Sequence, residues 1–288
     1  MNRKLGWILV FSLGLAAAAH GQPATASTAV HGRFISFDVP GAIDTEPTSL
    51  SPDGKIVGVY TSSDGHQHGF LLNNGKYQTI DYPGSTETAA RWINPSGEIV
   101  GEYTDTSGKI HGYILYKGQF VSFDYPSANS TTAFGVGANA DIVGPYTTLP
   151  FTFHGFLLSK GQFSTMDFPG AMWTLPTMIV GQRIVGGYFD STFTPHGFLL
   201  DHGSFQEISC PGYTNVFLSG LNPRGDMTGG FNSSNGVQHG LLVRNGACIS
   251  IDFPGAISAY ANCADPGGNI VGRYTDSSGK THGYLRIK

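Results

Sequence analysis

Charged residues are scarce in this sequence and make up only 12% of its 288 positions. Such sparse charge does not suit a helical protein, whose surface is usually rich in Lys, Glu and Arg. Gly (41 residues), Phe (19) and Tyr (13) are abundant instead. Aromatic residues favour strands and glycine favours tight turns, so the composition predicts an all-β protein. Its length allows one large domain or two.

An excess of basic charge is also lacking, since 16 Lys and Arg stand against 20 Asp and Glu, for a formal net charge of −4. A mildly acidic surface argues against binding to nucleic acid or to an anionic membrane. The chain contains no serine nucleophile elbow, Walker loop or dinucleotide-binding fingerprint. The usual sequence signals of several large enzyme classes are therefore absent.

Cysteine is limited to Cys210, Cys248 and Cys263, which cannot all pair within the chain. No CxxC spacing typical of a metal site occurs. One bridge plus one buried thiol could form in an oxidising compartment, but we favour the simpler interpretation that all three are small buried apolar residues.

The N-terminus has the pattern of a bacterial secretory signal peptide. Arg3 and Lys4 precede the apolar run Leu5–Ala19, which ends in the small-x-small triplet Ala19-His20-Gly21. The run is about 15 residues long, shorter than the roughly 20 that a membrane span needs. We predict a signal peptide over residues 1–21, a flexible leader over 22–31, and a secreted or periplasmic mature protein without a membrane span.

A repeat of 42 or 43 residues fills the rest of the chain, with copies that start at Gly32, Gly75, Gly118, Gly161, Gly203 and Gly246. Each copy has a strand-like run ending near a proline, an Ile-Val-Gly-x-Tyr type of segment and a His-Gly pair followed by an apolar residue. The glycine inside the apolar segment indicates a bulge or a close backbone approach. Four short strands in a repeat of this length are typical of a propeller blade.

The phase of the repeat predicts how the ring closes. The chain begins with a fourth-type strand at 33–40 and ends with a third-type strand at 281–288, so pairing the two would complete the last blade and leave no open edge. We predict a single six-bladed β-propeller over 32–288, most simply a monomer, with blades at about 42–83, 85–126, 128–169, 171–211, 213–254 and 256–288. A parallel β-solenoid is the alternative, but its coils are usually shorter and need end caps.

Three motifs carry a resemblance to a known family: Asp81-Tyr-Pro-Gly, Ile99-Val-Gly-Glu-Tyr-Thr-Asp and His111-Gly-Tyr. In these, the sequence resembles the HAF-type extracellular repeat family of exported bacterial proteins over residues 32–288. The resemblance implies export and a propeller-like fold, and it implies no general biochemical activity.

Histidine recurs at one repeat position, as His68, His111, His154, His196, His239 and His282. A third-strand position lies well outside the central channel, too far for one shared ion. We predict buried histidines hydrogen-bonded within their own blades, with Asp38, Asp81, Asp124, Asp167 and Asp252 as partners; one copy has Ser209 there instead. The Thr104–Gly108 and Thr275–Gly279 loops resemble Asp-box hairpins, and we interpret them as turns in which Asp satisfies local backbone donors.

A ligand site is expected where the copies differ, because residues needed for every blade should recur. The differences concentrate in the first strand, whose alternate residues share one face and should line the channel. These residues are Asp44, Glu46 and Thr48; Glu87, Ala89 and Arg91; Ser130, Thr132 and Phe134; Trp173, Leu175 and Thr177; Asn215, Phe217 and Ser219; and Ser258, Tyr260 and Asn262. The intervening threonines, such as Thr45 and Thr88, should face the packing between blades.

Two loops between the second and third strands, Leu149–Phe153 and Phe189–Phe193, are unusually apolar. With Met172 and Trp173 they would form an aromatic wall on the channel rim over blades three and four, opposite the carboxylates of the first two blades. We predict ligand-binding residues Trp173, Phe217, Tyr260, Phe134, Phe151, Phe193 and Met172. A concave site with an apolar wall and a few polar groups is the usual ligand site, although the same side chains could simply plug the channel.

Three functions fit these patterns. The first is a secreted binding or scaffold protein for a carbohydrate, a peptide or a small apolar molecule. The second is a hydrolase or lyase with candidate catalytic residues Asp44, Glu46, Glu87 and Arg91; no cofactor is evident, but Asp44, Glu46, Glu87, Asn215 and Asn262 could hold Ca²⁺ through oxygen atoms. The third is a structural component of the cell envelope.

Overall fold

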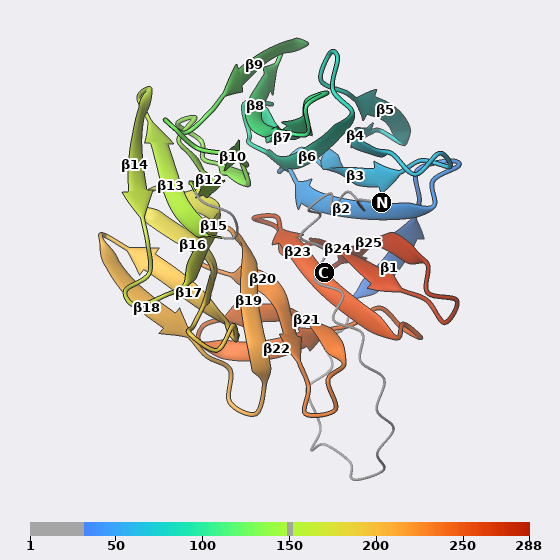
Figure 1. Ribbon diagram of the computed structural model, residues 1–288. Coiled ribbons are helices and arrows are strands. Elements are labelled where there is room, and N and C mark those ends of the chain that lie inside the picture. The colour runs from blue at the N-terminus through green and yellow to red at the C-terminus, as the bar shows by residue number, and fades with distance from the viewer. Residues whose placement is uncertain (1–31, 149–151) are drawn as a thin grey trace, which may run out of the picture.

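The computed structural model describes residues 32–148 and 152–288, and these form a six-bladed β-propeller (Figure 1). Within the described residues all regular elements are strands, and there is no helix that could cross a membrane. The predicted fold class and number of blades are confirmed. Export and the predicted leader concern residues 1–31, which lie outside the described part.

Each blade is an antiparallel sheet, and in blades one to five its strands follow one another in the chain. Blade one contains β2 (Asp44–Leu50), β3 (Ile56–Thr61), β4 (Gln67–Asn73) and β5 (Lys76–Ile80); blade two contains β6 (Glu87–Ile93), β7 (Ile99–Thr104), β8 (Ile110–Tyr116) and β9 (Gln119–Phe123). Blade three contains β10 (Ser130–Thr131), β11 (Gly135–Val136), β12 (Ile142–Thr147), β13 (Phe153–Ser159) and β14 (Gln162–Met166), because its first strand is divided in two.

Blade four contains β15 (Trp173–Val180), β16 (Arg183–Phe189), β17 (Pro195–Asp201) and β18 (Ser204–Ile208). Blade five contains β19 (Thr214–Leu221), β20 (Met227–Asn232), β21 (Gln238–Arg244) and β22 (Ala247–Ile251). Blade six contains β23 (Ser258–Ala264), β24 (Ile270–Thr275) and β25 (Thr281–Ile287), and β1 (Arg33–Phe37) completes it. The first strands of the blades lie innermost around the channel (Figure 1).

Ring closure follows the prediction, because β1 pairs antiparallel with β25 in the register Phe34↔Arg286 to Phe37↔Gly283. The outermost strand of blade six therefore comes from the other end of the chain. A ring closed in this way leaves no open edge on β25, which would otherwise be the unpaired outer strand of blade six.

The glycine of the second strand is required by a close backbone approach. A Cβ added at Gly101 would lie 1.9 Å from the carbonyl oxygen of Ala89, and one added at Gly229 would lie 2.0 Å from that of Phe217. The first strands carry a register shift next to this contact, for example between Ala90 and Trp92. The prediction of a bulge or a close approach is confirmed, and both occur.

The repeated threonines of the first strand fasten blades one to four to the linker that precedes each of them. Thr45 and Thr88 are buried, and their hydroxyl oxygens accept hydrogen bonds from the backbone N–H groups of Val39 and Tyr82, at 3.0 and 2.9 Å. Thr131 and Thr174 make the same bond in blades three and four. These positions face the blade packing, as predicted.

The repeated histidine belongs to an aromatic stack. In blade two, Tyr82 lies on Tyr103 at 3.6 Å between ring centroids, and Tyr103 lies on His111 at 5.0 Å. The Nδ1 atom of His111 is 3.0 Å from the Asp124 carboxylate, so the histidine bonds within its own blade as predicted. The prediction of burial is wrong, because the side chain of His111 is 15% exposed and that of His154 is 31% exposed.

Blade four keeps this arrangement with a different acid. Ser209 occupies the position of the usual aspartate, and Nδ1 of His196 lies 3.4 Å from Glu207 instead. Its Nε2 atom lies 3.2 Å from the turn residue Asp190, as that of His111 lies 3.3 Å from Asp105. The hairpin turns behave as predicted: Asp105 accepts hydrogen bonds from the backbone N–H groups of Ser107 and Lys109. With the Ser107 hydroxyl, these bonds hold the pKa of Asp105 well below its ordinary value.

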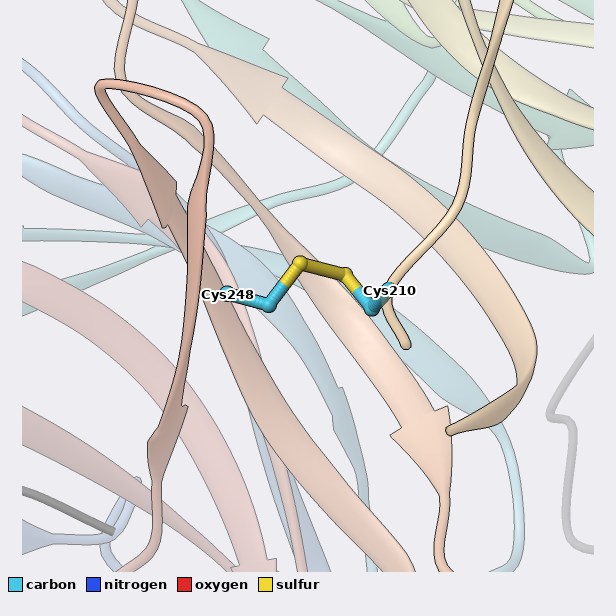
Figure 2. The surroundings of a disulfide bond; sticks show 2 residues. All are labelled: Cys210 and Cys248. Atoms are coloured by element: carbon cyan, nitrogen blue, oxygen red, sulfur yellow. A yellow bond between two sulfur atoms is a disulfide. The ribbon is translucent and has the colours of Figure 1, made fainter. Parts of the chain in front are cut away.

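A disulfide joins Cys210 to Cys248, with 5.8 Å between their Cα atoms (Figure 2). Aromatic pairs occupy the equivalent positions of other blades, for example Tyr82 with Phe120 at 5.1 Å between ring centroids. The interpretation of three small buried apolar cysteines is therefore wrong for this pair and holds only for Cys263, which is free and buried. The disulfide replaces a repeated packing contact between the incoming linker and the outer strand of blade five.

We expect reduction of this disulfide to lower the free energy of unfolding. The bond closes a loop with a sequence separation of 38. A loop of this size corresponds to about 4 kcal/mol in the chain-entropy model. Urea unfolding with and without reductant measures the difference, and Cys263→Ala serves as a control that should keep the same sensitivity. An identical unfolding curve in reductant would contradict a stabilising role.

Candidate functional site

The unrepeated residues of the inner strands meet their neighbours across the gap between blades. A Cβ added at Gly187 in β16 would lie 2.0 Å from the ring of Phe217, and one added at Gly230 in β20 would lie 2.4 Å from the ring of Tyr260. In both cases a glycine on one blade makes room for an aromatic ring from the next. Phe217 and Tyr260, which were predicted to bind ligand, therefore pack between blades, and Tyr260 is only 8% exposed.

A charged pair takes the equivalent place between blades six and one. Arg273 in β24 lies 3.9 Å from the carboxylate of Glu46 in β2, and its guanidinium lies 4.7 Å from the ring centroid of Tyr260. Both charged side chains are about one-fifth exposed, at 18% and 21%. At this junction too, a second-strand residue, Arg273, contacts a first-strand residue of the following blade, Glu46.

Between blades two and three, the same two positions hold Glu102 in β7 and the small Thr132, and here a pocket opens. Its volume is about 50 Å³, which is enough for a few water molecules or for the edge of a small ring. Its lining residues come from three consecutive blades: Gln67, Glu87, Thr88, Ala89, Arg91, Glu102, Tyr103, Thr104, Ile110, Thr132 and Phe134.

Arg91 and Glu102 form the polar centre of this pocket. The Nε atom of Arg91 donates to both carboxylate oxygens of Glu102, at 2.8 and 3.1 Å, and Nη2 donates to Oε1 as well. The two side chains are 23% and 14% exposed. Burial opposes the charge of Arg91, but the carboxylate of Glu102, with Glu46 further away, outweighs this effect and raises the pKa of Arg91.

An aromatic ring completes the pocket, because the guanidinium of Arg91 lies 5.7 Å from the ring centroid of Phe134 on blade three. Two predicted site residues, Arg91 and Phe134, are thus brought together with the predicted Glu87. A fixed guanidinium–carboxylate pair offers hydrogen-bond donors and acceptors side by side, and the ring beside it offers an apolar surface.

The aromatic wall predicted for blades three and four is present in its described part. Trp173 lies 5.2 Å from each of Phe153, Phe189 and Phe193 between ring centroids. Phe193 and Met172 are 53% and 43% exposed. Phe151, which was predicted to bind ligand, lies outside the described residues.

Two of the oxygen ligands proposed for Ca²⁺, Asp44 and Asn262, form hydrogen bonds with the backbone. Asp44 accepts a hydrogen bond from the backbone N–H of Thr281 at 3.0 Å, and the buried Asn262 donates to the carbonyl of Pro47 at 2.6 Å. Asn215 lies in β19 with a left-handed backbone, at φ 53°. In residues 32–148 and 152–288, no three His, Cys, Asp or Glu side chains gather as a metal site would require.

The sequence patterns did not identify two charged residues of the channel wall, Glu102 and Arg273, as candidate site residues. Both occupy the variable position of the Ile-Val-Gly-x-Tyr segment, which reads Val59, Glu102, Pro145, Gly187, Gly230 and Arg273. A rule that looked for unrepeated residues on the second strand as well as on the first would have found them. Alternation along that strand places this position on the opposite face from the residues on either side.

We expect Arg91→Leu to lower the free energy of unfolding by about 3 kcal/mol, because it leaves the Glu102 carboxylate without its partner. The double variant Arg91→Leu/Glu102→Leu should return to within about 1 kcal/mol of the wild type, since two apolar side chains replace a partly buried ion pair. Urea unfolding of the two variants measures both effects. A double variant as unstable as the single one would show that the pair is needed for packing.

No protein-family model matches the chain, and no curated protein sequence matches it. Solved structures share the fold. AofleA from Arthrobotrys oligospora is 13% identical, with 88% of this chain and 86% of the other covered and a TM-score of 0.59. The Aleuria aurantia lectin, described as a six-bladed β-propeller with a novel fucose recognition mode, is 12% identical, with 83% and 89% covered and a TM-score of 0.53. A mutant of that lectin, solved with Fucα1-6GlcNAc, is 10% identical, with 85% and 93% covered and a TM-score of 0.54. At these identities the likeness establishes the fold.

Proposed function

We propose that this protein is an exported, non-catalytic carbohydrate-binding propeller of the HAF-type extracellular repeat kind, with its ligand in the pocket of blades one to three. The observation that carries the proposal is the Arg91–Glu102 pair beside Phe134 in an open pocket. A sugar ring has hydroxyl groups that both donate and accept hydrogen bonds, and it has an apolar face of C–H groups. The pocket offers a partner for each of these features.

The structural neighbours support the choice of ligand class only as a starting point. Two of the three solved structures described above are of a lectin, one described as having a novel fucose recognition mode and one in complex with Fucα1-6GlcNAc. Their fold provides the same ring of inner strands, while their sequences share 10 to 12% of residues with this chain. Fucosides are therefore a sensible first probe, and a broad glycan array is the necessary second one.

Export is supported by two independent features. The first 21 residues have the charge and apolar pattern of a signal peptide. The Cys210–Cys248 disulfide is of the kind that forms and persists in oxidising compartments outside the cytosol. A carbohydrate-binding protein placed there would meet glycans of the cell surface or of the surroundings.

We expect the wild-type protein to bind at least one fucoside or other glycan on an array, and the Arg91→Leu/Glu102→Leu variant to lose that binding. Loss of a charge-assisted pair of hydrogen-bonding groups should weaken affinity at least about tenfold. Arg224→Ala is the matched control, because Arg224 is another partly exposed arginine, 46% exposed and close to Asp226 on blade five. Unchanged glycan binding in the double variant would contradict the proposed pocket.

The hydrolase or lyase alternative, with Ca²⁺ held through Asp44, Glu46 and Glu87, remains a prediction with its own test. A cation that binds only the folded protein raises the free energy of unfolding by about 2.7 kcal/mol at one hundred times its Kd. Thermal unfolding with EDTA and with Ca²⁺ measures this effect. A Tm that is the same in both would rule out a stabilising calcium site and leave the binding function in place.

A further inference from the structure

Phe193 occupies a backbone position that glycine occupies in other blades. Its φ is +61°, in the left-handed region that disfavours bulky side chains. The equivalent turn residues Gly65, Gly108, Gly236 and Gly279 have φ values of +85°, +88°, +81° and +88°. A phenylalanine at this place costs conformational free energy that a glycine would avoid.

The turn itself does not need the phenylalanine. The carboxylate of Asp190 accepts hydrogen bonds from the backbone N–H groups of Thr192 and Thr194, at 2.8 and 3.0 Å. The same bonds form around Asp105 in the blade-two turn, which has Gly108 at the equivalent place. The Phe193 side chain therefore has a role other than the formation of its turn.

That side chain is 53% exposed and lies edge-on to Trp173, at 5.2 Å between ring centroids. We call Phe153, Met172, Trp173 and Phe193 the rim platform. Met172 is 43% exposed beside it, so apolar surface remains open on two of its four members.

Two members of the rim platform occupy positions equivalent to residues that line the pocket, one blade further on for Phe153 and two blades further on for Trp173. Phe153 begins β13 as the pairing partner of Thr147, just as the pocket residue Ile110 begins β8 as the partner of Thr104. Trp173 begins β15 as the pocket residue Glu87 begins β6. The pocket and the platform thus lie on the same rim, on consecutive blades.

From this continuity we infer that the rim platform is a second subsite of the proposed carbohydrate site, so that the ligand is an oligosaccharide extending along the rim from blade two to blade four. One sugar unit uses the polar pocket at Arg91 and Glu102, and a further unit places its apolar face on Phe193 and Met172. Hydroxyl groups of Thr192 and Thr194 border the platform and suit a ligand that carries both apolar and hydroxyl surface. The inference rests on the proposed function.

The test compares chain lengths with the variant Phe193→Gly, which restores the residue that the repeat has elsewhere. An array of mono-, di- and tetrasaccharides from fucosyl, cello and chito series identifies a bound series, and calorimetry then gives affinities. In the wild type the tetrasaccharide should bind roughly tenfold more tightly than the monosaccharide. In Phe193→Gly that advantage should disappear, while monosaccharide affinity stays unchanged and Tm does not fall.

Ile257→Ala is the matched control, because Ile257 is an apolar rim residue of blade six with 54% exposure, and it should leave both affinities unchanged. Retention of the tetrasaccharide advantage in Phe193→Gly would overturn the second subsite and leave the proposed function intact. Loss of monosaccharide binding in that variant would also overturn it, by assigning Phe193 to the first subsite. Failure of the wild type to bind any sugar on the array would overturn the proposed function together with the inference.

Discussion

Antiparallel pairing of β1 with β25 is the constraint on which the rest of the structure depends. It joins residues 33–37 to residues 283–287 and turns a row of six small sheets into a closed ring. A single blade buries too little apolar surface to be stable alone, so each blade needs two neighbours. Closure supplies the second neighbour to the first and last blades, and it fixes the inner strands around one channel.

Contacts that fasten each blade and its incoming linker are preserved by position more than by residue type. The linker residue and the outer-strand residue pack as Tyr82 with Phe120 in blade two, but they are joined as a disulfide, Cys210 with Cys248, in blade five. Likewise the histidine of blade four turns to Glu207 where an aspartate is missing. The ring needs a stabilising contact at each of these positions, and aromatic packing, a disulfide or a histidine–carboxylate pair can provide it.

Residue types in the channel wall also vary from blade to blade, because several kinds of contact can fill the same position. Between neighbouring blades, a glycine faces an aromatic ring at Gly187 and Phe217, and an arginine faces a glutamate at Arg273 and Glu46. Where Glu102 faces the small Thr132, the gap is not filled and a pocket remains. Function on this scaffold is therefore expected where the filling between blades is incomplete, with polar groups already held in place by neighbours on the same blade.

The sequence by itself determined the fold, because a repeat of constant length with turn residues at fixed places leaves a closed ring of four-stranded blades as the simplest solution. It also identified Arg91, Phe134, Met172, Trp173 and Phe193 as positions where the copies differ. Only the tertiary structure showed that Arg91 is paired with Glu102 and that the ring of Tyr260 packs against Gly230. It also showed that two of the cysteines form a disulfide. These outcomes depend on contacts between residues far apart in the chain or on facing strands, and a periodic pattern specifies which face a side chain takes but not which neighbour it meets.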